Sequence, residues 1–316
     1  MDISSIFGAT VRPDPALLFR RDDPSDPRLG QVVLVDPEDF GRAEIVLLGC
    51  PQDLGVARNG GRVGAAAGPR AIRERLYRLV VPPAARLFDL GDTPVDGELE
   101  AIHARHHAIV AALLAAGKRV ISLGGGNDLA YPDGAALASV FGAEQSFIAN
   151  LDTHFDVRPD QPRNSGTPYR QLLVEGHVLG ANFAELGHQP FAVAAAHRQF
   201  LADHGALVLN LAQWRQRGIS SVIGDLIAQQ QSKAQMWGLD LDVVRASDAP
   251  GVSAPNASGL SAEELLACAE VIGASAAWRV IELSELNPTY DLDGRTARLA
   301  ASVIWTILAA TPAHSA

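Results

Sequence analysis

The stretch SFIANLDTHFD (residues 146–156) decides the fold class of this 316-residue chain. Residues 146–152 form an apolar-rich run of the kind that makes a buried strand, and the run turns acidic at its end. The segments RVISLGGGND (119–128) and AQMWGLDLD (234–242) change character in the same way. Because functional groups gather at the carboxyl ends of strands in open α/β sheets, these segments predict a site at one edge of such a sheet.

Working outward from residue 146, short apolar runs alternate with amphipathic segments. Strand-like runs cover 44–50, 86–92, 119–125, 146–152, 206–211, 234–244 and 278–286, with a weaker candidate at 177–183, and helix-like runs cover 67–79, 98–116, 192–204, 261–274 and 294–309. This alternation predicts a parallel sheet covered by helices on both faces. With no repeat or low-complexity linker, the chain is expected to form a single domain, 1–316, whose Pro-, Asp- and Arg-rich residues 1–40 make a surface arm.

Composition argues against several classes of protein. The chain has 36 acidic and 26 basic residues and a formal net charge of −10, which argues against a nucleic-acid partner, because such binders need a basic face. No apolar run approaches the roughly 20 residues of a membrane span, and the first residues do not resemble a signal peptide. The two cysteines, Cys50 and Cys268, are far apart and outside any CxxC motif, so a cytoplasmic location is expected.

The acidic strand ends predict a metal centre. Asp152, His154 and Asp156 alternate along the chain and can share one face of a strand, as can Asp240 and Asp242. Carboxylates gathered beside an apolar segment repel one another, and protonation or a bound cation relieves the repulsion. Two divalent ions would neutralise four aspartates. Oxygen ligands with one imidazole suit Mn²⁺ better than structural zinc, and two metals about 3.5–4 Å apart can share a hydroxide nucleophile.

Simpler interpretations exist for each motif. A DxD motif at a strand end is common in proteins that bind no metal there. Asn127 could be no more than an N-cap for the turn that follows it. GGGND (124–128) lacks the spacing of a nucleotide-binding loop. The rarer DxHxD, together with DxD and GGGND after separate strands, favours the two-metal hypothesis. His103, His106 and His107 are interpreted as surface residues of helix 98–116, because no HExxH pattern is present.

The sequence resembles the ureohydrolase superfamily, which contains arginase, agmatinase and formimidoylglutamase. The matching motifs are GGGND (124–128), DTHFD (152–156), GLDLDVVRASDAPGVSAPNASGLS (238–261), ELNP (285–288) and the upstream segment GVARNGGRVGAAAGPRAIR (55–73). The similarity runs from about residue 45 to residue 309. Within the superfamily, RNGGRVGAAAGP (58–69), DVRP (156–159) and NSGTPYRQLL (164–173) most resemble formimidoylglutamase.

This resemblance implies a three-layer α/β/α fold with a mainly parallel eight-stranded sheet, a trimer or hexamer, and two Mn²⁺ per subunit. Asp152 and Asp240 would bridge the metals. His154 and Asp242 would complete one shell, and Asn127 and Asp156 would belong to the other. Asp156 would also pass a proton to the leaving amine, and Glu285 would hold the amidinium group. The implied reaction is hydrolysis of N-formimidoyl-L-glutamate to L-glutamate and formamide, a step of histidine degradation.

Asn127 departs from the family pattern, in which histidine is the usual first ligand. An amide oxygen is a weaker donor than imidazole, so the site containing Asn127 is expected to bind Mn²⁺ more weakly. The glutamate end of the substrate needs cationic or N–H donors. Six candidates lie in the loops that follow the metal motifs: Arg158, Arg163, Asn164, Tyr169, Arg170 and Arg245. Of these, Arg158 and Arg170 are preferred.

Two other functions stay open. The chain could be a ureohydrolase that acts on agmatine or another guanidino compound. It could also be a non-catalytic relative in which Asn127 weakens metal binding. Retention of both DxHxD and DxD argues against the second alternative, because an unused acidic cluster is costly to bury. In the enzyme hypotheses the partner is a small-molecule substrate, and neither nucleic acid nor membrane is expected.

Overall fold

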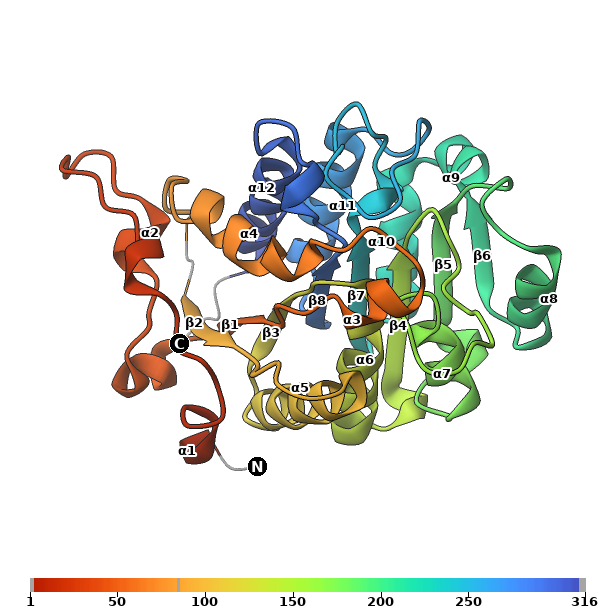
Figure 1. The fold of residues 1–316 in the computed structure, drawn as a ribbon, viewed down its shortest axis with the longest axis horizontal. Helices are drawn as coiled ribbons and strands as arrows, with labels where there is room; N and C mark the ends of the chain where they lie inside the picture. Colours follow the sequence, from red (N-terminus) through yellow and green to blue (C-terminus); the bar gives the residue numbers. More distant parts are fainter. Residues whose placement is uncertain (1–2, 84–85, 313–316) are drawn as a thin grey trace.

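Eight parallel strands form one sheet at the centre of the computed structural model, which describes residues 3–83 and 86–312 (Figure 1). Their order is β2-β1-β3-β8-β7-β4-β5-β6. The strands are β1 (Ile45–Gly49), β2 (Leu87–Asp92), β3 (Arg119–Leu123), β4 (Ser146–Leu151), β5 (Phe183–His188), β6 (Leu207–Asn210), β7 (Ala234–Asp240) and β8 (Trp278–Ser284). The predicted parallel eight-stranded α/β fold is confirmed. The central strands are apolar along most of their length because helices cover both of their faces.

Two helical layers enclose the sheet (Figure 1). One layer contains α4 (Gly68–Leu76), α9 (Leu211–Arg217), α10 (Ile219–Gln229), α11 (Ala262–Ala274) and α12 (Arg295–Ala310). The other contains α5 (Leu99–Ala115), α6 (Ala130–Phe141), α7 (Pro168–Val174) and α8 (Ala195–Asp203). The short helices are α1 (Ile3–Ile6), α2 (Leu29–Val32) and α3 (Leu54–Arg58). Within residues 3–83 and 86–312, no helix has both the length and the apolar character needed to cross a membrane.

The predicted helices appear close to their expected bounds. The helix expected at 261–274 is α11, and it begins with a capping box: the Glu264 amide donates to Ser261 Oγ at 3.1 Å, and the Ser261 amide donates to Glu264 Oε2 at 2.8 Å. The prediction of a strand at 177–183 is wrong, because the strand in this region, β5, occupies 183–188. Its polar residues Glu185 and His188 are fully buried, so the apolar pattern ends before the real strand begins.

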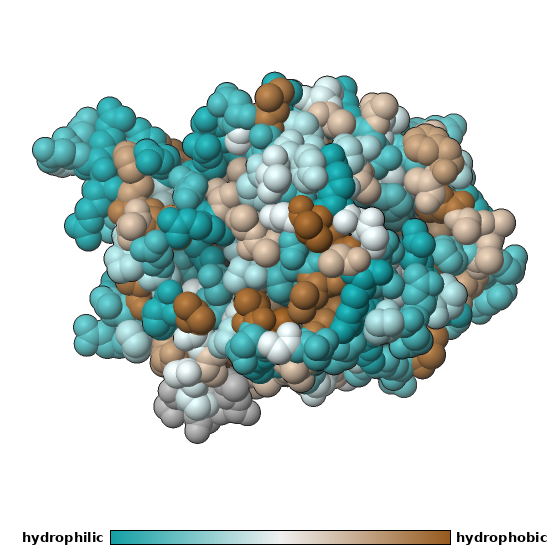
Figure 2. Space-filling view, in the orientation of Figure 1, coloured by the Kyte–Doolittle hydropathy of each residue, from teal (hydrophilic) through white to brown (hydrophobic). Residues whose placement is uncertain are grey.

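The segment predicted as a surface arm packs against the edge of the sheet. Val11 and Asp92 exchange two backbone hydrogen bonds of 2.8 Å, and the Leu34 amide donates to the Leu87 carbonyl at 2.9 Å. Ile6 and Leu29 are fully buried, whereas most of 20–28 is exposed and forms a hydrophilic lobe (Figure 2). The segment therefore protects edge strand β2 from pairing with another chain. Residues 1 and 2 lie outside the described range.

Candidate metal centre and active site

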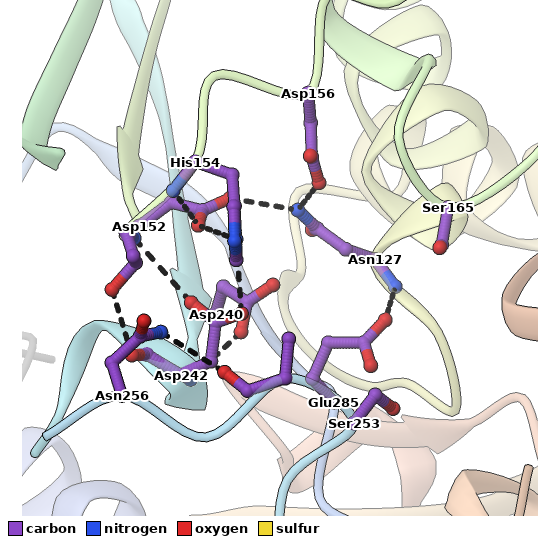
Figure 3. A network of polar contacts seen from close by, with 12 residues as sticks. Asn127, Asp152, His154, Asp156, Ser165, Asp240, Asp242, Ser253, Asn256 and Glu285 are labelled. Carbon is purple, nitrogen blue, oxygen red and sulfur yellow. Dashed lines mark hydrogen bonds and ion pairs between the residues drawn. The ribbon is translucent and has the colours of Figure 1, made fainter. Parts of the chain in front are cut away.

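The acidic motifs meet because their strands are neighbours. β3, β8, β7 and β4 lie side by side, and the chain leaves each at the same edge of the sheet. The four strand ends carry Asn127 after β3, Glu285 after β8, Asp240 and Asp242 at β7, and Asp152, His154 and Asp156 after β4. Figure 3 shows these side chains turned toward one another. The predicted convergence is therefore present in the structure.

Two overlapping groups of side chains can each hold a cation. One group is Asp152, His154 and Asp242, and the other is Asp152, Asp156 and Asp240. Within each group the ligand atoms lie within 4.8 Å of one another, and Asp152 belongs to both. His154 Nδ1 lies 3.1 Å from Asp242 Oδ2 and 3.4 Å from Asp152 Oδ1. A shared carboxylate with separate partners on either side is suited to two adjacent metal ions.

Asn127 lies against the second group. Its Nδ2 donates to Asp156 Oδ2 at 2.7 Å and to Asp152 Oδ2 at 3.3 Å (Figure 3). Its Oδ1 accepts from Ser284 Oγ at 3.2 Å. Presenting the amide oxygen to a cation there takes a half-turn of the amide. The Ser284 hydroxyl can then accept from Nδ2, because a hydroxyl serves as donor or acceptor.

The electrostatics of the cluster favour a cation. Burial, with repulsion from Asp152, raises the pKa of Asp156 well above its ordinary value. Burial, with repulsion from Asp242, does the same to the pKa of Asp240. Attraction to Asp242 raises the pKa of His154 to about 12, and burial raises the pKa of Asp242 to about 6. Carboxylates that resist ionisation are stabilised by a divalent charge, and these oxygen donors with one imidazole fit Mn²⁺.

Two residues of the site have unusual backbone geometry. Asp156 has φ 46° and Glu285 has φ 66°, in the left-handed region that side chains other than glycine seldom adopt. Each such conformation costs about 1–3 kcal/mol and persists where surrounding contacts hold it. The Tyr169 amide donates to the Asp156 carbonyl at 3.2 Å, and the Glu285 amide donates to the Gly125 carbonyl at 2.8 Å. This geometry carries no signal in the sequence.

Glu285 presents a carboxylate oxygen for a ligand. It lines a cavity of about 230 Å³ together with His154, Asp156, Asp240 and Asp242. Its Oε1 accepts from the Asn127 amide at 2.8 Å, whereas its buried Oε2 has no partner in the described structure. Burial raises the pKa of Glu285 to about 8. A planar N–H cation in the cavity would satisfy Oε2 and favour the ionised form.

Arg158 is the one predicted contact to the glutamate end of the substrate that lines this cavity. No ion-pair partner for its guanidinium is present in residues 3–83 and 86–312. A Cβ on Gly166 would lie 2.7 Å from Arg158 Cδ and 3.2 Å from Asn59 Nδ2, so the arginine occupies this place because residue 166 has no side chain. An unpaired guanidinium beside the carboxylate cluster is suited to an anionic group of a ligand.

The other predicted substrate contacts lie outside the cavity, each for a physical reason. Arg170 stacks on the Phe200 ring at 4.1 Å, and Arg245 pairs with Asp248 at 3.0 Å. Asn164 accepts from the Gly166 amide and closes its own loop, Arg163 pairs with Glu175, and Tyr169 is fully buried against Phe183. All of these residues follow metal motifs, but local packing turns their side chains elsewhere.

Sequence reasoning missed several residues of the cavity. His197 comes from α8, outside every motif, and burial together with the charge of Arg158 lowers its pKa. Asn59 and Gly60 lie in RNGGRV (58–63), which was noted only as part of the resemblance and which could have identified them. Ser253 comes from the Pro- and Gly-rich loop after β7.

The interpretation of His103 and His106 as surface residues is wrong. Both are buried, because this face of α5 packs on the sheet and on α6. His103 Nε2 lies 2.8 Å from Asp128 Oδ2, and His106 Nε2 lies 3.0 Å from Asp133 Oδ1. Asp128 is thus paired with histidine rather than joined to the metal-binding groups.

Comparisons with known proteins agree with this geometry. The Arginase family model matches residues 43–310. The formimidoylglutamase of Rhodococcus jostii is 37% identical over 315 residues, covering 94% of this chain and 95% of that protein, and the one from Klebsiella pneumoniae is 37% identical over 312 residues, covering 93% and 96%.

Solved structures give the same result. A crystal structure of Trypanosoma cruzi formiminoglutamase with Mn²⁺ superimposes with a TM-score of 0.85 at 34% identity, covering 91% of this chain and 100% of that one. The formimidoylglutamase of Bacillus subtilis gives a TM-score of 0.85 at 25% identity, covering 92% and 94%. The resemblance drawn from the motifs is confirmed, and the chain belongs to the arginase family.

Proposed function

We propose that this chain hydrolyses N-formimidoyl-L-glutamate to L-glutamate and formamide with the aid of two Mn²⁺, as a step of histidine degradation. One observation carries the proposal: Glu285, whose buried Oε2 has no partner in the described structure, lines the same cavity as members of the two metal-binding groups that share Asp152. Support also comes from the formimidoylglutamase relatives and from the Mn²⁺ in the T. cruzi structure.

The proposed ligands follow the two groups. Asp152 and Asp240 would contribute to both metal sites, His154 and Asp242 would complete one of them, and Asn127 and Asp156 would complete the other. Bound Mn²⁺ supplies Lewis acidity and lowers the pKa of a water molecule so that hydroxide is available at neutral pH.

The chain's own residues orient the substrate and move the proton. Glu285 Oε2 accepts N–H bonds from the planar amidinium and turns its carbon toward the carboxylate cluster. Asp156 takes a proton from the attacking water and passes it to the leaving nitrogen of glutamate, the role that the ureohydrolase resemblance implies. The backbone hydrogen bonds that hold the left-handed conformation at both residues also fix the positions from which these carboxyls extend.

Arg158 is proposed to bind a carboxylate of the glutamate end, beside His197. Arg158→Ala is expected to raise KM for N-formimidoyl-L-glutamate by about 10-fold or more, as for the loss of a charge-assisted hydrogen bond worth about 1.5–3 kcal/mol. KM for a formamidine without carboxylates should change little. Arg170→Ala is the control, because Arg170 lies outside the cavity. Equal effects of Arg158→Ala on both substrates would reject this role.

The substrate is tested directly with purified protein on N-formimidoyl-L-glutamate, arginine and agmatine, with and without added manganese. Formamide release from the first substrate, dependent on manganese, is the expected result. Urea from agmatine or another guanidino compound, without formamide, would favour the alternative ureohydrolase activity. No product from any of them, with or without manganese, would favour the non-catalytic relative.

The metal held by Asn127, Asp152, Asp156 and Asp240 is expected to be lost first on dialysis. The reason is that the amide oxygen of Asn127 is a weaker donor than imidazole. Mn²⁺ is titrated back while the bound ion is counted, and one tight and one weak equivalent are expected. Two equally tight equivalents would contradict the weaker-site proposal.

The remaining expectations belong to the same proposal. We place the enzyme in the cytoplasm as a single-domain homo-oligomer, a trimer or hexamer, as the ureohydrolase resemblance implies. The two free, buried cysteines, Cys50 and Cys268, suit a reducing compartment. Light scattering on the purified chain measures the assembly, and a monomer would reject that part of the proposal.

A further inference from the structure

A row of polar positions crosses the sheet just below the proposed metal centre. The strand register aligns Glu185 with Asn150, Asn150 with Gly238, Gly238 with Glu282, and Glu282 with Ser122. We call these five residues the polar row. Gly238 has no side chain, and the side chains of the other four are fully buried. Because buried polar groups are costly unless they are hydrogen-bonded, the row needs an explanation.

Asn150 joins this row to the metal-binding cluster. Its Nδ2 donates to Asp152 Oδ2 at 3.1 Å and to Glu185 Oε2 at 3.1 Å. An asparagine amide has two N–H donors, and here both meet a carboxylate. The amide nitrogen rather than the amide oxygen thus faces both carboxyl groups.

Gly238 leaves room for two buried oxygens beside it. A Cβ at Gly238 would lie 3.4 Å from Asn150 Oδ1 and would clash with the Tyr169 hydroxyl. Both oxygens are buried and lack another partner in the part of the chain that the structure describes. The absence of a side chain at Gly238 therefore leaves room for the Tyr169 hydroxyl, which lies beside the row rather than in the substrate cavity.

We propose that Asn150 is a positioning residue that holds Asp152 in its metal-binding orientation, and that Glu185 anchors Asn150 from the other side. The inference rests on the proposed function, in which Asp152 bridges both Mn²⁺. Outer partners of metal ligands fix their orientation, and losing one typically costs about 10–100-fold in metal affinity. Asn150 donates to Oδ2 of Asp152, whereas Oδ1 accepts from the His154 amide at 2.6 Å, so the two oxygens are held from different sides.

The competing explanation is that Asn150 only satisfies a buried polar position. Glu282→Gln is the matched control, because Glu282 lies in the same row and is equally buried but forms no hydrogen bond with Asp152 in the described structure. A purely structural role predicts that Asn150→Ala lowers the melting temperature but leaves the Mn²⁺ affinity of the folded protein unchanged. A positioning role predicts that the Mn²⁺ affinity falls as well.

Mn²⁺ binding is measured by the EPR signal of the free ion during titration of wild type, Asn150→Ala, Asn150→Leu and Glu282→Gln. We expect Mn²⁺ affinity to fall about 10–100-fold in both Asn150 variants and to stay near wild type in Glu282→Gln. Asn150→Leu fills the volume without donors, so it separates hydrogen bonding from packing. Circular dichroism identifies the variants that fold.

If neither Asn150 variant folds, Glu185→Ala keeps the amide but removes its anchor, and weaker Mn²⁺ binding is again expected. Wild-type affinity in every folded variant overturns the positioning role. Absence of Mn²⁺ binding by the wild type would instead overturn the proposed function on which the inference rests, so the two failures are distinguishable.

Discussion

Asp240→Asn is expected to lower kcat/KM by about 10³-fold or more and to leave at most one Mn²⁺ bound per chain. Asp240 forms one of the two metal-binding groups together with Asp152 and Asp156, and it is proposed to bridge both metals. Removing one preorganised electrostatic partner costs about 10²–10³-fold in rate, and a bridging ligand acts on two ions. Steady-state kinetics and elemental analysis after desalting measure the two effects.

The control for Asp240→Asn is Asp248→Asn, which changes a carboxyl close in the sequence that pairs with Arg245 outside the cavity. Wild-type activity and metal content are expected for this control. If Asp240→Asn keeps both as well, Asp240 is not a metal ligand.

The same substitution should not weaken the metal-free protein. Burial and repulsion from Asp242 raise the pKa of Asp240 in the folded state. A raised carboxyl pKa favours folding while the group is protonated, at pH below its ordinary value, and this contribution is lost as the pH rises through the folded-state pKa. At neutral pH the neutral amide removes repulsion, so the melting temperature without metal should equal or exceed that of wild type. A large fall would indicate a structural role instead.

Arg73→Met is expected to lower the free energy of unfolding by about 3–5 kcal/mol. Arg73 is 2% exposed and binds Asp89 through Nε at 2.9 Å and through Nη2 at 3.0 Å. It also binds Asp92 at 2.7 Å, and Asp92 pairs with Val11 of the N-terminal segment. Removing the guanidinium leaves the fully buried Asp89 without its cation, and the penalty comes from that uncompensated charge.

Urea unfolding compares Arg73→Met with Arg70→Met. Arg70 lies in the same helix, but its side chain is 57% exposed and its ion pairs with Asp14 and Glu74 are at the surface. Its loss should cost less than about 1 kcal/mol. Similar losses of stability in both variants would contradict a dominant role for the buried pair.

The sequence predicted the metal-binding groups because their signal is local. Asp152, His154 and Asp156 follow one apolar run, and Asp240 and Asp242 end another, so it was enough to expect that these strands are neighbours. The substrate contacts have no such signal. Arg158 and Arg170 follow the same motif, yet only Arg158 lines the cavity. Arg170 instead packs on the ring of Phe200, which belongs to the later helix α8. That contact depends on tertiary packing.

Buried polar residues account for the missed elements. β5 was not recognised because Glu185 and His188 interrupt its apolar pattern. His103 was interpreted as a surface residue because it belongs to no HExxH pattern. In the structure Glu185 accepts from Asn150, and His103 pairs with Asp128. These partners come from other strands and helices, so only the assembled sheet shows why the polar residues are buried.

Diffraction at the manganese absorption edge, from crystals grown with Mn²⁺, locates the ions directly. Two anomalous peaks about 3.5–4 Å apart are expected between Asp152 and Asp240. One should lie beside His154 and Asp242, and the weaker one beside Asn127 and Asp156. Crystals that bind no manganese at Asp152, or that bind it only elsewhere, would contradict the assignment of this cluster as a two-metal hydrolytic centre.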